Sequence, residues 1–289
     1  MRKLLLMLSL SGLSILSVHA SPITVIAAEN FYGELVREIG GDQVKVQSII
    51  SNPDADPHLF TTSPALNRSL SKAQIIIYNG AGYDSWMEQM LATNSRNNQV
   101  SLIKVADLVG VKDGENPHLW YKPETFPKLA NLIATKLIQL NPQSKTTITN
   151  NLNNFLAEHA KVIQLIAQTK AKYQGTPVTA TEPVYGYMAQ ALGLTMLGND
   201  FQWKIMNDTE PTPQIIASYQ NLLTHKKVKI LFYNNQVTEP VTKNMQELAK
   251  QQKIQVVGVS ETMPNQLTVN HWLRNEIQAT TKALAVTNQ

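Results

Sequence analysis

The sequence predicts an α/β protein with two lobes, each with a mostly parallel sheet flanked by helices, joined by one long rigid helix. Short runs rich in β-branched residues alternate with helical stretches in both halves of the chain. This alternation is typical of βα units, which build parallel sheets. Between the halves, apolar residues recur every three or four positions over about 30 residues, which predicts a helix of ~45 Å.

Local patterns place each element. In the first half, β-branched runs predict strands at 23–27, 44–50, 75–78 and 100–105. Helices are predicted at 32–39, where Gly40-Gly41 ends the helix, and at 85–91. Another helix is predicted to begin at Ser63-Pro64, where serine caps the helix and proline fits its first turn. An apolar stripe over 126–140 ends at Asn141-Pro142, where the long helix follows. In the second half, strands are predicted at 178–180, 228–233 and 256–259, and helices at 185–192, 213–223, 241–251 and 269–285. We therefore expect four parts: a signal peptide at 1–20, an N-terminal lobe at 21–141, a connecting helix at 142–174 and a C-terminal lobe at 175–289.

The first twenty residues resemble an export signal. Arg2 and Lys3 precede an apolar stretch of about fifteen residues, and Val18-His19-Ala20 resembles a cleavage site. That stretch is shorter than the ~20 residues that a membrane span needs. The sequence has no cysteine, which excludes disulfides, thiolate ligands and cysteine nucleophiles. We expect a cleaved signal peptide and a periplasmic protein with no lipid anchor.

The charge of the chain gives no indication of a polyanionic partner. The formal net charge is +4, and the basic residues are scattered apart from a short stretch at 226–229. No aromatic-rich basic segment is present for base stacking. We expect no nucleic-acid partner, and we expect a monomer.

Two similar tetrapeptides, Asp56-Pro57-His58-Leu59 and Asn116-Pro117-His118-Leu119, indicate a metal site. Proline fixes its own φ and keeps the preceding residue out of the helical region, so each histidine lies in a stiff turn. A stiff imidazole suits a preorganised metal ligand. One such tetrapeptide alone would be an ordinary turn, but the repetition favours His58 and His118 as ligands.

Two glutamates complete the predicted site. Glu182 and Glu261 each follow a predicted strand of the second half, where open parallel sheets form binding crevices. Glu182 could instead stabilise the following helix, because a negative charge at its N-terminus interacts favourably with the helix dipole. Glu261 has competitors in the same lobe, namely Asp200, Glu210 and Glu239.

Two neutral imidazoles and two carboxylates balance the charge of one divalent ion. Nitrogen and oxygen donors without sulfur suit Mn²⁺, Fe²⁺ or Zn²⁺. The ligands must be deprotonated to bind, so affinity should decrease as the pH falls.

Structural roles suffice for the other histidines, His159, His225 and His271. Trp120 either covers the site or packs in the core.

At these residues the chain resembles the metal-specific solute-binding proteins that deliver manganese, zinc or iron to ABC importers. The motifs that carry the resemblance are residues 52–64 around His58, residues 73–80 with Asp84-Ser85-Trp86-Met87, residues 116–120 around His118, residues 181–194 around Glu182, and Val259-Ser260-Glu261-Thr262. The resemblance implies a four-ligand site of His58, His118, Glu182 and Glu261 for one cargo ion, and a membrane permease as partner. Two features differ from those of family members dedicated to zinc and argue weakly against a dedicated zinc protein: the loop 112–115 lacks histidine, and the third ligand is glutamate.

The sequence thus predicts a binding protein and not an enzyme. Four protein ligands close the coordination shell, whereas catalytic metal sites keep one position open. No His-Glu-x-x-His or phosphate-binding glycine motif is present. Two rivals stay open: a secreted metalloenzyme that uses His58, His118 and Glu182 with Glu261 as the base, and a metal-binding adhesin.

Overall fold

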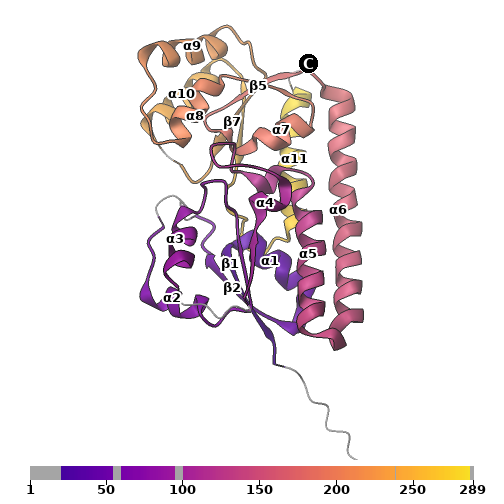
Figure 1. Cartoon of the computed structure of the whole chain (residues 1–289). Coiled ribbons are helices and arrows are strands. Elements are labelled where there is room, and N and C mark those ends of the chain that lie inside the picture. Colours follow the sequence, from indigo (N-terminus) through magenta and orange to yellow (C-terminus); the bar gives the residue numbers. More distant parts are fainter. Residues whose placement is uncertain (1–20, 55–59, 95–99, 238, 287–289) are drawn as a thin grey trace, which may run out of the picture.

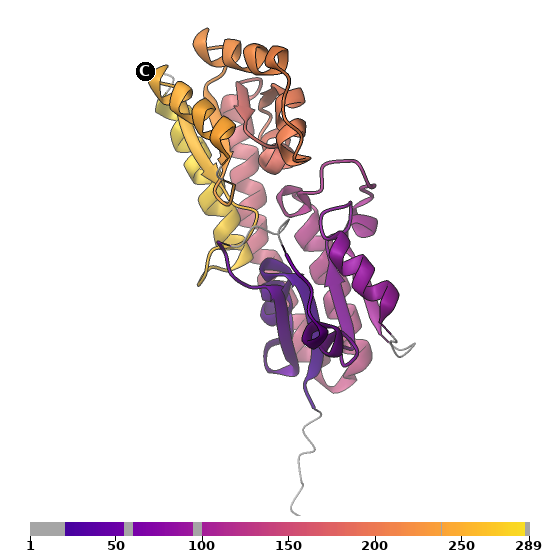
Figure 2. The same cartoon turned by 90° about the vertical axis from the view of Figure 1, so that its left-hand side faces the viewer.

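The computed structural model describes residues 21–54, 60–94, 100–237 and 239–286, which form two α/β lobes beside one long helix (Figure 1). Figure 2 shows the two lobes one above the other, with the first half of the chain in the lower lobe. Each lobe holds a four-stranded parallel sheet, in the order β2-β1-β3-β4 and β6-β5-β7-β8. The predicted fold class is therefore confirmed.

In the first lobe, side chains that alternate along the strands divide between two cores. The strands are β1 (Ile23–Glu29), β2 (Val44–Ile50), β3 (Ile75–Tyr78) and β4 (Ser101–Lys104), and the helices are α1 (Asn30–Gly40), α2 (Pro64–Leu70), α3 (Ser85–Thr93) and α4 (Val105–Val109), with a 3-10 turn at Gly41–Gln43. On β1, Val25 and Ala27 pack on the side of α1, whereas Ile26 and Ala28 pack on the side of α2 and α3. Both faces of the sheet are buried, as parallel sheets require.

The second lobe repeats this arrangement. Its strands are β5 (Pro177–Ala180), β6 (Thr195–Leu197), β7 (Ile230–Asn234) and β8 (Gln255–Val259), and its helices are α7 (Gly186–Ala191), α8 (Asn199–Met206), α9 (Pro213–Thr224), α10 (Pro240–Gln251) and α11 (Val269–Val286), with a 3-10 turn at Pro183–Tyr185. Thr212 caps α9 by accepting a hydrogen bond from the Ile215 N–H, and Pro213 begins the helix. In both sheets the second strand in sequence lies on one side of the first and the third strand on the other. The loops after the strands therefore diverge and leave a crevice.

One helix, α6 (Lys145–Tyr173), runs along both lobes (Figure 1). It follows α5 (Thr125–Leu140) and a 3-10 turn at Pro142–Ser144, and a further 3-10 turn lies at Leu119–Tyr121. It packs against α1 of the first lobe and α11 of the second. The predicted long helix is thus present, while the exact domain boundaries stay a prediction.

The lobes also share one apolar core. Phe31 of α1 lies 5.6 Å from Trp272 of α11, and Tyr121 lies 4.9 Å from Tyr185, measured between ring centroids. Tyr185 in turn lies 4.9 Å from Phe232 on β7. These rings belong to a single cluster of buried residues that extends from the first sheet to the second. A continuous close-packed core resists separation of the lobes.

Apart from the 3-10 turns, three helices and strands of the described residues were not predicted. α4 is only five residues long, and β6 is a three-residue edge strand, so neither is long enough to establish a periodicity. α8 carries polar residues among its apolar ones and therefore lacks a clear stripe. The prediction also stopped β1 at residue 27, two residues before its end at Glu29.

Glu276 on α11 supplies a pH-dependent contribution to stability. Burial raises its pKa to about 7 from the ordinary 4.5, although Trp272 Nε1 donates a 3.2 Å hydrogen bond to its Oε1. Because the folded-state pKa is the higher one, the protonated group stabilises the fold below about pH 4.5. That contribution is lost as the pH rises to about 7.

Between pH 4.5 and pH 8, the free energy of unfolding of the unsubstituted protein should fall by about 2–3 kcal/mol more than that of Glu276→Gln. Urea unfolding at the two pH values measures the difference. Glu247→Gln, on the exposed face of α10, should behave like the unsubstituted chain. If Glu276→Gln declines as steeply as Glu247→Gln, this assignment is wrong.

Candidate metal centre

Two carboxylates of the second lobe meet at one amide. Glu182 directly precedes the 3-10 turn after β5, and Glu261 lies two residues after β8. Their side chains are buried, with exposures of 4% and 0%. The amide nitrogen of Asn234, the last residue of β7, donates to Glu182 Oε2 at 3.1 Å and to Glu261 Oε1. The ends of three neighbouring strands thus place both predicted glutamates together.

His118 is fully buried at the start of the 3-10 turn after α4. Its Nδ1 lies 2.6 Å from Oδ1 of Asn116, whose amide nitrogen donates to the Pro183 carbonyl oxygen at 2.8 Å. The Asn116 oxygen is therefore the acceptor, and His118 Nδ1 carries the proton. In this tautomer Nε2 holds the lone pair that a metal ion binds. The indole of Trp120 packs edge-on at 5.2 Å, so this tryptophan both contacts the site and belongs to the core.

Tyr83 connects His118 to the second lobe. Its ring centroid lies 6.1 Å from that of His118, and its hydroxyl donates to Glu261 Oε2 at 2.9 Å. Burial and the neighbouring Glu261 carboxylate raise the pKa of Tyr83 well above its usual range, so it stays protonated. Tyr83 therefore links His118 to Glu261 across the lobes, and Asn234 links Glu261 to Glu182. Within the described residues alone, no three acidic or imidazole side chains form a group that could hold a metal ion.

His58 lies outside the described residues, within 55–59. The chain just before it is held against the second lobe at Pro53. The Pro53 carbonyl oxygen accepts hydrogen bonds from Gln236 Nε2 at 2.9 Å and from Thr262 Oγ1. Gln236 Oε1 also accepts from the Glu261 N–H at 3.1 Å. Pro53 is thus anchored beside Glu261.

A buried acidic pair supports the turn that carries Tyr83. Asp84 accepts hydrogen bonds from the backbone N–H groups of Asn79 and Gly80, at 2.7 and 2.8 Å. Burial raises the pKa of Asp84 to about 6. Burial and the adjacent Asp84 raise the pKa of Glu29 well above its usual range, which favours its protonated form. Asn79 Nδ2 donates to the Pro117 carbonyl oxygen at 2.8 Å, so this network also reaches the loop of His118.

The remaining candidates lie apart from the cluster. Among the competing acids, Asp200 and Glu210 are exposed, and Glu239 is partly exposed at the start of α10. His159 is buried, with Nδ1 bonded to Asn270 Oδ1 at 2.8 Å, and burial lowers its pKa. His225 and His271 are exposed. Nothing among the described residues places these side chains near Glu182 or Glu261.

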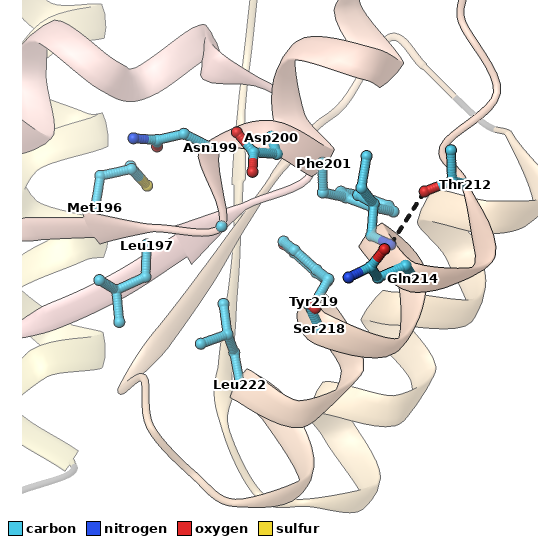
Figure 3. A pocket seen from close by; sticks show the side chains of 12 residues that line it. Met196, Leu197, Asn199, Asp200, Phe201, Thr212, Gln214, Ser218, Tyr219 and Leu222 are labelled. Carbon is cyan, nitrogen blue, oxygen red and sulfur yellow. Dashed lines mark hydrogen bonds between the residues drawn. The ribbon is translucent and has the colours of Figure 1, made fainter.

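A cavity of about 740 Å³ lies elsewhere in the second lobe, between β6, α8 and α9 (Figure 3). Leucine, phenylalanine and tyrosine side chains line it, and Asp200 is its one carboxylate. Figure 3 shows Tyr219 and Leu222 on one wall and Met196 and Leu197 on another. With one acid and no imidazole in its lining, this cavity lacks the donors for a transition-metal ion.

Two parallel-sheet lobes joined by a long helix, with imidazole and carboxylate groups buried between them, define a metal-specific solute-binding protein. The family model ZnuA, described as zinc-uptake complex component A, periplasmic, matches residues 25–283. The chain belongs to this family. Its members are substrate-binding transport proteins and not enzymes.

Relatives agree in length and fold. The metal ABC transporter substrate-binding lipoprotein SsaB of Streptococcus sanguinis is 26% identical over 240 residues, which cover 77% of this chain and 75% of that protein. The iron ABC transporter substrate-binding lipoprotein MtsA of Streptococcus pyogenes serotype M1 is 24% identical over 249 residues, which cover 80% and 78%. A ZnuA crystal structure matches with a TM-score of 0.71 at 20% identity and covers 93% of this chain and 100% of its own. A Mn-bound mutant of the periplasmic metal binding protein from Candidatus Liberibacter asiaticus reaches 0.74 at 17% identity and covers 91% and 99%. The structural matches show the fold.

These relatives correct the predicted localisation. The expectation of a periplasmic protein with no lipid anchor is contradicted, because the relatives are named lipoproteins. The expectation rested on the resemblance of residues 1–20 to a cleaved export signal and on the lack of cysteine in the sequence. Residues 1–20 lie outside the described part of the chain. In the described part, no helix has both the length and the apolar character to cross a membrane.

Proposed function

We propose that this chain captures one divalent transition-metal ion between its lobes and delivers it to the membrane permease of an ABC importer. The ion is Mn²⁺ or Zn²⁺, with Fe²⁺ as the third candidate. The ligands are His58, His118, Glu182 and Glu261, and the protein acts as a monomer. The relatives named for manganese and iron, and the family named for zinc, support a divalent cargo.

The observation that carries this proposal is the meeting of Glu182 and Glu261 at Asn234, beside the His118–Tyr83 pair. Both carboxylates are almost fully buried. Two buried acids that face each other repel and lose hydration, which is costly unless a cation compensates their charge. A divalent ion between them supplies that compensation, and neutral imidazoles complete the shell without adding charge.

The shell also argues for transport over catalysis. Four protein ligands leave no open position for a substrate, whereas catalytic ions retain one. With lobes at 21–141 and 175–289 and the connecting helix at 142–174, two ligands come from each side of the long helix. An ion bound in this way is held by ligands from both lobes.

Metal analysis tests the proposal. The full chain, purified without an affinity tag and stripped with a chelator, is titrated with Mn²⁺, Fe²⁺ and Zn²⁺ and then desalted. We expect about one equivalent of at least one of these ions to stay bound. Less than ~0.2 equivalents of every ion after titration would contradict the proposed function.

A further inference from the structure

Glu29, the last residue of β1, carries a fully buried carboxyl group. Among the described residues, neither of its oxygens accepts a hydrogen bond from an N–H or O–H group, and neither forms an ion pair with a basic side chain. The hydroxyl of the neighbouring Tyr32 is used elsewhere, because it donates to Asn79 Oδ1 at 2.7 Å. An ionised carboxylate without donors is costly in a protein interior. The neutral form of Glu29 is therefore favoured.

The Glu29 carboxyl is hydrogen-bonded to the carboxyl of Asp84. Two carboxyl groups can form this bond only if one of them keeps its proton. Both Asp84 oxygens already accept backbone N–H groups, those of Asn79 and Gly80, and such bonds favour the ionised form. Since Glu29 lacks such donors, the proton lies on Glu29, which donates it to Asp84. Burial raises both pKa values, that of Asp84 to about 6 and that of Glu29 well above its usual range.

Asp84 connects this proton to the loop of His118. Its Oδ2 accepts the backbone N–H of Asn79 at 2.7 Å. The Asn79 side chain accepts from the Tyr32 hydroxyl at Oδ1, so its Nδ2 faces the Pro117 carbonyl oxygen, to which it donates at 2.8 Å. Pro117 directly precedes His118. Asn79 and Asp84 are 0% and 1% exposed, so bulk water does not replace these bonds if they are lost.

We propose that Glu29 is a positioning residue for the metal site, which keeps its carboxyl proton, donates it to Asp84 and so holds the His118 loop in place. This inference rests on the proposed function. An ionised Glu29 would place two negative charges side by side and would drive the turn at 79–84 away from β1. A side chain without a donor at position 29 would leave Asp84 one hydrogen bond short, and the turn would be held less firmly.

The first test detects the proton and needs no metal. Infrared difference spectra of the metal-free full chain at pH 8, native minus Glu29→Gln, should contain the carbonyl stretch of a protonated carboxylic acid. The other acids with strongly raised pKa values do not interfere, because burial raises those of Glu38 and Glu276 only to about 7 and their bands cancel in the difference. A difference spectrum that contains a carboxylate band instead overturns the inference.

The second test compares two variants. Glu29→Gln keeps the shape and an N–H donor for Asp84, whereas Glu29→Met keeps the length and removes the donor. The dissociation constant is measured by chelator competition for the ion that the native chain binds most tightly among Mn²⁺, Fe²⁺ and Zn²⁺. We expect it to rise about threefold or more in Glu29→Met and to stay within about twofold of the native value in Glu29→Gln.

Nitrogen-15 spectra of the metal-free chains report on the loop directly. In Glu29→Met the ring N–H resonance of His118 should move further than that of His159, a buried histidine on α6 that serves as the control. In Glu29→Gln neither resonance should move. A general loosening of the fold would displace both resonances alike, and the glutamine variant would not correct it.

The outcomes separate this inference from the proposed function. If Glu29→Met does not show both changes, or if Glu29→Gln is equally impaired, the role of Glu29 is overturned and metal capture stays intact. A native chain that binds none of the three ions contradicts the proposed function, and the infrared band and the His118 resonance then still decide whether Glu29 holds the loop. Should Glu29→Met fail to fold, the infrared band together with native-like affinity of Glu29→Gln supports the inference, and the lack of either overturns it.

Discussion

Replacing Trp120 by alanine is expected to lower the free energy of unfolding by about 3–5 kcal/mol. The indole is fully buried and touches both the core and the site. Its ring centroid lies 5.0 Å from Phe31 and 5.2 Å from His118. Removing it opens a cavity in the core that the lobes share, so both the lost burial and the void destabilise the fold.

Urea unfolding followed by circular dichroism measures this loss. Leu102→Ala is the control, because Leu102 on β4 is 45% exposed and should cost less than about 0.5 kcal/mol. A Trp120→Ala variant as stable as Leu102→Ala would mean that the shared core is not packed as described.

His118→Ala is expected to weaken metal binding at least tenfold, which is ~1.4 kcal/mol. The substitution removes a nitrogen ligand whose tautomer is set by Asn116. Competition titrations with the preferred ion measure the change. His58→Ala should give a loss of similar size if the two tetrapeptides play equivalent roles.

His159→Gln is the matched control. This histidine is also buried and also hydrogen-bonded to an asparagine, Asn270, but it lies on α6 away from the carboxylates. Metal affinity should not change. Equal losses in His118→Ala and His159→Gln would show that general loosening of the fold, and not loss of a ligand, weakens binding.

Much of the fold could be predicted because the apolar periodicities are strong. The runs at 23–27, 44–50 and 75–78 fall within strands β1, β2 and β3, and the 29-residue helix α6 follows its predicted stripe. Sheet order was not predictable, because it depends on contacts between strands that no local pattern encodes. Short elements such as β6 were missed because three residues are too few to show a periodic pattern of apolar side chains.

The candidate site was predictable only in part. Proline-stiffened histidines and acids after strands are visible in a sequence, and the structure brings Glu182 and Glu261 together at Asn234. His118 is connected to Glu261 through Tyr83, and the four-residue ligand set stays a prediction. Tyr83 and Asn234, which join them, were missed because neither is a common transition-metal ligand. One pattern could have suggested Asn234: it directly follows the predicted strand at 228–233, in the same half of the chain where Glu182 and Glu261 follow predicted strands. The role of Tyr83 depends on a contact between lobes, which only the three-dimensional arrangement reveals.

Anomalous X-ray diffraction from crystals grown with Mn²⁺ or Zn²⁺ tests the central claim most directly, because it locates the ion. We predict one strong peak between the lobes, about 2.0–2.3 Å from a ring nitrogen of His118 and from carboxylate oxygens of Glu182 and Glu261. The same peak should lie within that distance of a ring nitrogen of His58. A peak at any other place, or none at full metal saturation, would contradict the account.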